Sequence, residues 1–260
     1  MTIRQNILWK NMLLSFGIMI IAYMGMALPE WLVSADWGDA FRPSALQQSI
    51  IGIFFGGMML LLPLCAGITS GLEQAGEILS SMFVWKLGRS SIGKYARSQL
   101  VSAFLRSAFC VWAAFAVNAA LWNIIAHPCD IAAYPYHEIG FAEDCLYAEW
   151  YCWRGGILMY LWMGAGIFIC GGVWGLVSMA VSMYLPDRIM AIAIPTCIYY
   201  FLSSGIFRRL LGWEIPHPST LYNDALTWPM AGKAMLENAV ISGLSVFLYI
   251  YGIRRRIRHA

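Results

Sequence analysis

Charged side chains are scarce in this sequence. Only 12% of its 260 residues are Asp, Glu, Lys or Arg, whereas 60% are hydrophobic. Soluble domains carry about twice that charged share, so the composition excludes an ordinary soluble protein. The mean hydropathy of +0.64 agrees with this. The net charge of +3 says little about partners, and we predict no nucleic-acid partner.

Catalytic motifs are also missing from the apolar segments. The sequence contains neither H-E-x-x-H nor G-x-S-x-G. Three polar side chains stand out in the third apolar run, Arg106, Asn118 and Asn123. An ionisable group inside a membrane is a candidate functional site, although Arg106 lies close enough to one edge to snorkel. Asn side chains in such helices usually form interhelical hydrogen bonds. We therefore expect no enzyme activity in this chain.

Long apolar runs dominate the chain. They approach or exceed the roughly 18 to 20 residues that a helix needs to cross a bilayer, and they are continuous rather than alternating, which excludes a membrane barrel. The sequence predicts an all-α polytopic membrane protein, a single domain over residues 1–260 with six transmembrane helices. The predicted spans are 12–32, 49–70, 100–125, 155–185, 189–207 and 234–253.

The connections between these runs predict the orientation. With the N-terminus inside, most of the 17 Lys and Arg residues fall on the cytosolic side and most of the 14 Asp and Glu residues fall outside. This asymmetry follows the positive-inside rule. Both termini are therefore expected in the cytosol. Residues 1–11 are either an amphipathic helix in the membrane interface or a frayed basic end.

One polar segment, residues 70–99, separates the second and third predicted spans. Its charged residues are Glu73, Glu77, Lys86, Arg89, Lys94 and Arg97. The stretch 88–95 matches G-x-x-x-x-G-K, but Tyr95 replaces the Ser or Thr of a nucleotide-binding loop, and the segment is too short for the required α/β domain. We interpret it as a turn between two cytosolic helices, with Lys94 and Arg97 contacting lipid headgroups or a partner.

Three cysteines fall in the predicted external loop 126–154: Cys129, Cys145 and Cys152. Their spacing matches no compact zinc pattern, so a disulfide is the better interpretation on an oxidising outer side. The leading pairs are Cys145–Cys152 and Cys129–Cys145. A second external segment, 208–233, contains three prolines around a short apolar stretch.

This layout resembles the permease subunits of ABC-2 type exporters, which have a type V exporter-like architecture. Members of that family have six spans with cytosolic ends, an N-terminal interfacial helix, a cytosolic coupling helix between spans two and three, and an outer re-entrant segment between spans five and six. The corresponding stretches here are 3–10, 70–99 and 208–233. The size is similar to that of small bacterial permeases of peptide or lantibiotic export and self-immunity.

The inner loop carries part of the family's pattern, an acidic residue, a glycine, an apolar helix and then basic residues. Here it reads Glu73, Gly76, Glu77, Ile78, Leu79, Arg89, Tyr95 and Arg97. The family's usual Pro before the Arg is replaced by Gly88. Negative charge suits a helix start, and side chains four apart share one side. The residues expected to couple to an ATPase are Glu73, Glu77, Met82, Phe83, Trp85, Arg89, Arg97, Asp187 and Arg188.

The resemblance implies a permease in the bacterial plasma membrane, paired with a second copy or a homologous chain. ATP and Mg²⁺ are expected on a separate ATPase subunit, and no cofactor on this chain. The expected activity is the export of an amphipathic or hydrophobic substrate, such as a peptide, an antibiotic or a lipid. The alternative is a non-transport immunity or sensor protein that binds a peptide through the loop 126–154.

Overall fold

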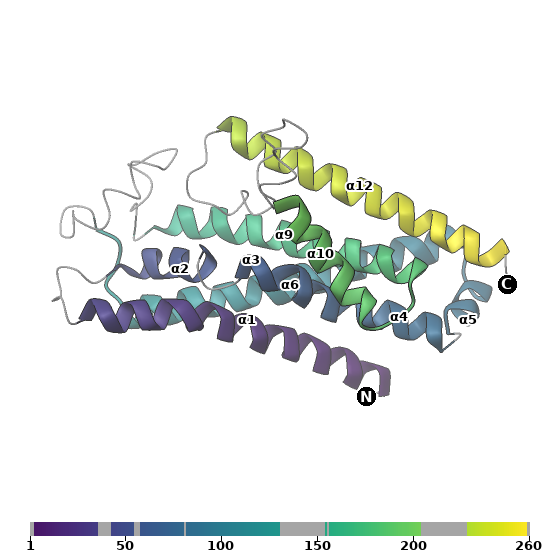
Figure 1. The fold of residues 1–260 in the computed structure, drawn as a ribbon, viewed down its shortest axis with the longest axis horizontal. Helices are drawn as coiled ribbons and strands as arrows, with labels where there is room; N and C mark the ends of the chain where they lie inside the picture. Colours follow the sequence, from purple (N-terminus) through teal and green to yellow (C-terminus); the bar gives the residue numbers. More distant parts are fainter. Residues whose placement is uncertain are drawn as a thin grey trace.

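The computed structural model describes residues 3–35, 43–54, 58–80, 82–130, 154, 156–203 and 228–258, and the regular structure within these ranges is helical (Figure 1). The elements are α1 Ile3–Ala35, α2 Ala45–Phe54, α3 Met58–Ala66, the π-helix η2 Gly67–Gly71, α4 Leu72–Leu79, α5 Met82–Gly88, α6 Ile92–Ile125, α9 Ile157–Tyr184, α10 Met190–Ser203 and α12 Trp228–Arg258. The predicted all-α class is confirmed over this part of the chain.

Four helices of the described chain are long and apolar enough to cross a membrane. The apolar stretches are Ile7–Ser34, Ile92–Ile125, Ile157–Tyr184 and Gly232–Arg258. They coincide with the first, third, fourth and sixth predicted spans. The second predicted span corresponds to α2 and α3, and the fifth to the shorter α10. The length and apolar composition of these four helices indicate a membrane protein.

The N-terminal helix α1 runs without interruption from Ile3 to Ala35. At about 1.5 Å per residue it is roughly 50 Å long, and Pro29 lies within it. The interfacial helix suggested for residues 1–11 is therefore not a separate element, because residues 3–11 continue directly into the first apolar run. The side chains of Leu13, Leu14 and Ile21 are exposed, as expected for a surface that faces lipid.

The helix that contains the second predicted span does not end at Ser70. It passes from α3 through the π-helix η2 into α4 and ends at Leu79. Single-turn π-helices are rare and often mark functional sites. Ser70 and Gln74 are buried, so the first two turns of the polar segment belong to the helix bundle rather than to an exposed loop. The start of the predicted segment 70–99 is therefore packed within the protein, while its position relative to the membrane stays a prediction.

Helix α9 forms the centre of the bundle and is the most buried of the four long helices. Its glycines allow α6 to approach closely, as small residues do in membrane helix packing. A Cβ atom on Gly175 would lie 2.5 Å from the hydroxyl of Ser107, and one on Gly172 would lie 2.3 Å from the ring of Phe104. Larger residues at these two positions would force α6 and α9 apart.

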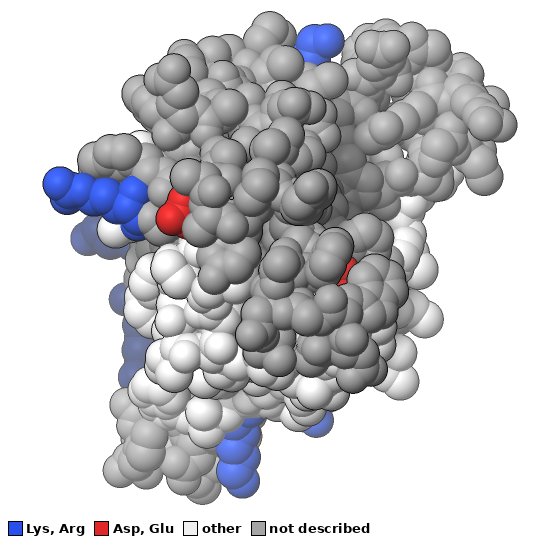
Figure 2. Space-filling model, turned by 90° about the vertical axis from the view of Figure 1, so that its left-hand side faces the viewer, with Lys and Arg blue, Asp and Glu red and all other residues white. Residues whose placement is uncertain are grey.

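The two ends of the bundle differ in the chain segments and charged residues that lie there. Both termini lie toward the same end, together with α4 and α5 (Figure 1). Viewed from the opposite end, most of the described surface is uncharged, and Lys and Arg stand at its margins (Figure 2). Residues 36–42, 131–153 and 204–227 lie outside the described residues, and with them most of the predicted external segments 126–154 and 208–233.

The packing of α6 on α9 predicts that the same substitution at two glycines changes the free energy of unfolding differently. Gly175→Ala places a methyl group against Ser107 and should lower the free energy of unfolding by about 1–3 kcal/mol. Gly243→Ala on α12 meets nothing within 4 Å and should leave stability unchanged or raise it, because Ala favours helix. Thermal unfolding of the purified protein in detergent checks both. Equal effects at the two sites would contradict this packing.

Candidate functional site

The turn between α5 and α6 contains the sequence that resembles a nucleotide-binding loop. The backbone amides of Arg89 and Ser90 donate to the carbonyl groups of Lys86 and Leu87, each at 3.3 Å. The Ser91 hydroxyl accepts from the amide of Lys94 at 3.4 Å and caps α6. The preceding element is helix α5, where a nucleotide-binding loop needs a strand. The interpretation as a turn between two helices is confirmed.

Glu73 and Glu77 both face α6. Their spacing of four residues places them on one side of α4, as predicted, but that side faces the protein. Glu73 forms an ion pair with Arg106 of α6, and both side chains are mostly buried. The Nε atom of Arg106 also donates to the carbonyl of Ser102 at 3.0 Å. The sequence left two interpretations of Arg106 open, snorkelling to the membrane edge or a functional site. The ion pair with Glu73 gives this charge a partner inside the protein.

Glu77 joins three helices. Its side chain is 5% exposed and forms an ion pair with Lys86 of α5. The hydroxyl of Tyr95, on α6, donates to the other carboxylate oxygen at 3.3 Å. The ring of Tyr95 also meets the ring of Phe83 edge-on, with centroids 5.7 Å apart. The carboxylate and the aromatic pair together hold α5 against the end of the bundle.

A layer of small polar side chains continues from these acids into the bundle. The hydroxyl of Ser107 on α6 pairs with Thr69 at 2.7 Å and also with Ser70. Ser182 on α9 donates to the carbonyl of Gly71 at 3.1 Å. Interhelical bonds of this kind satisfy polar groups that would otherwise be costly in an apolar bundle. The layer therefore connects η2 to both α6 and α9.

Gln74 extends this layer toward α12. Its amide nitrogen lies 3.5 Å from the sulfur of Met183 on α9. Its carbonyl oxygen accepts from the hydroxyl of Tyr249 on α12 at 3.4 Å. The sequence reasoning missed Gln74 and Tyr249. The sequence nevertheless contained a signal for both residues. A Gln one turn from an acid and a Tyr inside a long apolar run both need hydrogen-bond partners when they are buried.

Helix α5 presents an exposed apolar surface. Met82, Val84 and Trp85 are 46%, 54% and 70% exposed, and the guanidinium of Arg89 lies 5.4 Å from the centroid of the Trp85 ring. Phe83, in contrast, is 4% exposed and belongs to the core. Of the predicted coupling residues on α5, Met82 and Trp85 are therefore available to a partner and Phe83 is not.

The remaining predicted coupling residues lie at the same end. Arg97 is exposed on the first turns of α6. Asp187 and Arg188 are exposed in the short connection between α9 and α10. The Asp187 carboxylate accepts from the amides of Ile189 and Met190 at 2.8 and 3.0 Å. These bonds cap the start of α10, so Asp187 has a structural role that the sequence reasoning did not assign.

The described residues include one of the three cysteines of the predicted disulfide, Cys129. Cys129 follows the end of α6 and is disulfide-bonded. The candidates Cys145 and Cys152 lie outside the described residues, so the pairing is not assigned. Among the described cysteines, those within the apolar helices are free thiols: Cys65, Cys110, Cys170 and Cys197. A bonded cysteine agrees with an oxidising environment at this end of the molecule.

The Glu73–Arg106 pair predicts a pattern in stability. Glu73→Gln or Arg106→Gln alone should lower the free energy of unfolding by about 1–3 kcal/mol, because each leaves a mostly buried charge without its partner. The double variant should recover part of that loss. Arg97→Gln, at an exposed position of the same helix, is the matched control and should be neutral. Thermal unfolding in detergent measures all four, and additive losses in the double variant would argue against the pair.

Comparisons with protein-family models, curated proteins and solved structures find no match to this chain. The description of the molecule therefore rests on its own residues. Those residues form an all-helical membrane protein in which a polar layer connects the bundle to a short, partly exposed helix at the end that holds both termini.

Proposed function

We propose that this chain is the membrane-spanning permease subunit of an ATP-driven ABC exporter of the ABC-2 type in the bacterial plasma membrane. It moves an amphipathic or hydrophobic substrate outward while a separate ATPase subunit hydrolyses ATP. The observation that carries the proposal is helix α5, which exposes Trp85, Val84 and Met82 at the end of the bundle that holds both termini. A contiguous exposed apolar group on a short helix beside charged residues suits a surface that a partner covers.

The position of α5 suits a docking element. Aromatic and Arg side chains dominate binding energy at protein interfaces, and Trp85 with Arg89 supplies both on one short helix. Lys86 is drawn inward by Glu77, so the apolar side chains rather than the lysine face a partner. In the proposed complex, Arg97 and Arg188 form the polar rim around this contact.

The contacts of α5 provide a route for movement into the bundle. A displacement of α5 acts on α4 through Lys86 and Glu77, and on α6 through Phe83 and Tyr95. Helix α4 continues through η2 into α3, so the same displacement reaches the middle of the bundle. The force from ATP hydrolysis would enter at α5 and act on these helices.

The proposed architecture has six spans and cytosolic termini. Helices α1, α6, α9 and α12 are four of the spans, the pair α2 and α3 is the second, and α10 is the fifth. A second copy or a homologous permease encloses the substrate path. ATP and Mg²⁺ bind to the ATPase, because the glycine-containing turn at 88–94 connects two helices rather than a strand and a helix.

The test is association with an ABC-type ATPase subunit, and an ATPase gene neighbouring this one, if present, supplies the first candidate. Trp85→Ala should weaken co-purification of that ATPase about tenfold or more and abolish stimulated ATP hydrolysis in liposomes, as expected for a hot-spot aromatic. Trp9→Ala, at a tryptophan of α1 that is 51% exposed, is the matched control and should have no effect.

Unchanged association and hydrolysis in the Trp85→Ala variant would contradict α5 as the docking helix. If no ATPase associates with the unmodified protein, the exporter assignment itself fails. Deletion of residues 131–153 then tests the alternative, since a peptide-binding immunity protein would lose peptide protection when this loop is removed.

A further inference from the structure

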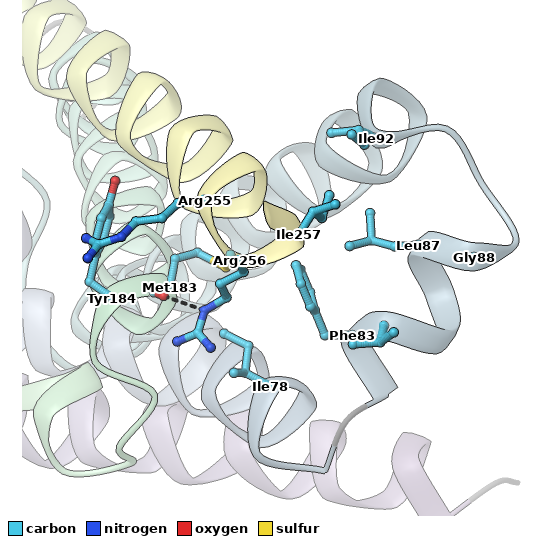
Figure 3. A pocket seen from close by; sticks show the side chains of 12 residues that line it. Ile78, Phe83, Leu87, Gly88, Ile92, Met183, Tyr184, Arg255, Arg256 and Ile257 are labelled. Carbon is cyan, nitrogen blue, oxygen red and sulfur yellow. Dashed lines mark hydrogen bonds between the residues drawn. The ribbon is translucent and has the colours of Figure 1, made fainter. Parts of the chain in front are cut away.

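A groove opens between α4, α5 and the last turns of α12. It has a volume of about 730 Å³, within the range of small-molecule sites. Figure 3 shows apolar side chains facing one another across it, and they belong to α4, α5, α6 and α12. This apolar wall consists of Ile78, Phe83, Leu87, Ile92 and Ile257. We call this feature the α5–α12 groove.

Arginine side chains stand on the α12 side of the α5–α12 groove. Arg255 and Arg256 line it, and Arg254 and Arg258 are on the same two turns of α12. Among the described residues, the ion pairs at this end are those of Glu73 and Glu77 with partners on α6 and α5. Glu73 and Glu77 are therefore already neutralised, and the four arginines concentrate positive charge on the last two turns of α12.

Arg256 is positioned by the protein. Its Nε atom donates to the carbonyl of Met183 at the end of α9, at 2.8 Å. This bond leaves the four terminal N–H groups of the guanidinium for a ligand, in the planar arrangement that matches a phosphate. The favourable dipole at a helix C-terminus explains the presence of basic residues there. It does not explain the apolar wall beside them.

We propose that the α5–α12 groove binds an anionic phospholipid of the cytosolic leaflet. The phosphate binds to Arg256 and Arg255, and an acyl chain lies along the apolar wall. A lipid fits better than a soluble anion, because the cavity offers apolar walls from four helices. It also agrees with a cluster of four arginines in the last two turns of a helix long and apolar enough to cross a membrane, a pattern that attracts anionic headgroups.

The proposal has a consequence for α5. Phe83 and Leu87 belong to α5, and Arg256 belongs to α12. A bound lipid would therefore bridge the two helices and add to the contacts that hold α5, which include the ion pair with Glu77 and the packing of Phe83 in the core. The lipid site does not depend on an ATPase partner, so its test is independent of the exporter assignment.

Native mass spectrometry of the detergent-solubilised full chain tests the proposal. The protein is titrated with phosphatidylglycerol and with phosphatidylcholine of the same acyl chains, and apparent affinities are compared. The unmodified protein should prefer phosphatidylglycerol. The double variant Arg255→Gln/Arg256→Gln should lose about tenfold of that affinity, the scale expected for charge-assisted hydrogen bonds. Arg188→Gln, at an exposed arginine of the same end that does not line the groove, should change nothing.

A second variant separates the groove from general attraction to positive charge. Gly88 lines the groove, and a Cβ atom there meets nothing within 4 Å, so Gly88→Leu adds a bulky side chain at the rim of the groove without a clash and without altering the charge. This variant should weaken phosphatidylglycerol binding as strongly as the double arginine variant, and it keeps the test valid if that variant fails to fold. Undiminished binding in Gly88→Leu would overturn the proposal. Competition by soluble glycerol phosphate at the same concentration as the lipid would also overturn it, because it would show a phosphate site without an acyl chain.

Discussion

One buried carboxylate holds together the end of this structure at which both termini lie. Glu77 belongs to α4, but its two oxygen atoms bind Lys86 of α5 and Tyr95 of α6. A carboxylate that is almost completely buried is stable only when both oxygens have partners, so the positions of α5 and of the first turns of α6 follow from its presence. The exposed side chains of α5, the turn at 88–94 and the wall of the α5–α12 groove all depend on this arrangement.

Polar groups inside an apolar bundle impose a second constraint. Ser70, Ser107 and Ser182 lie where η2, α6 and α9 meet, and their hydroxyls bind one another or backbone carbonyls. Glycines make this distance possible, since a Cβ atom on Gly175 would collide with Ser107. The same helices thus pack tightly and carry a continuous polar layer up to Gln74. A displacement at α5 would have to pass through this layer to reach the centre of the bundle.

Much of the fold could be predicted from the sequence, because an apolar run long enough to cross a membrane has few alternatives to a helix. The long helices were predicted on this basis. The turn at 88–94 was predicted from its incomplete nucleotide-binding motif, and the shared face of Glu73 and Glu77 from their four-residue spacing. The inward direction of that face was not, because four-residue spacing defines a side of a helix but not what it contacts. Arg106 is thirty-three residues from Glu73, and such a pairing appears only once α4 and α6 are placed together. The burial of Ser70 and Gln74 was not predicted for the same reason, since both look exposed until their partners on α6, α9 and α12 are known.

Hydrogen–deuterium exchange of α5 tests the central role of Glu77 most directly. Replacing Glu77 by Ala removes both the ion pair with Lys86 and the bond from Tyr95. The account predicts that the amides of residues 82–88 then exchange much faster, while those of α9 keep their protection. Glu73→Ala, one turn earlier on α4, should leave α5 protected. If α5 exchanges at the same rate with and without Glu77, this carboxylate does not hold the end of the bundle and the account is wrong.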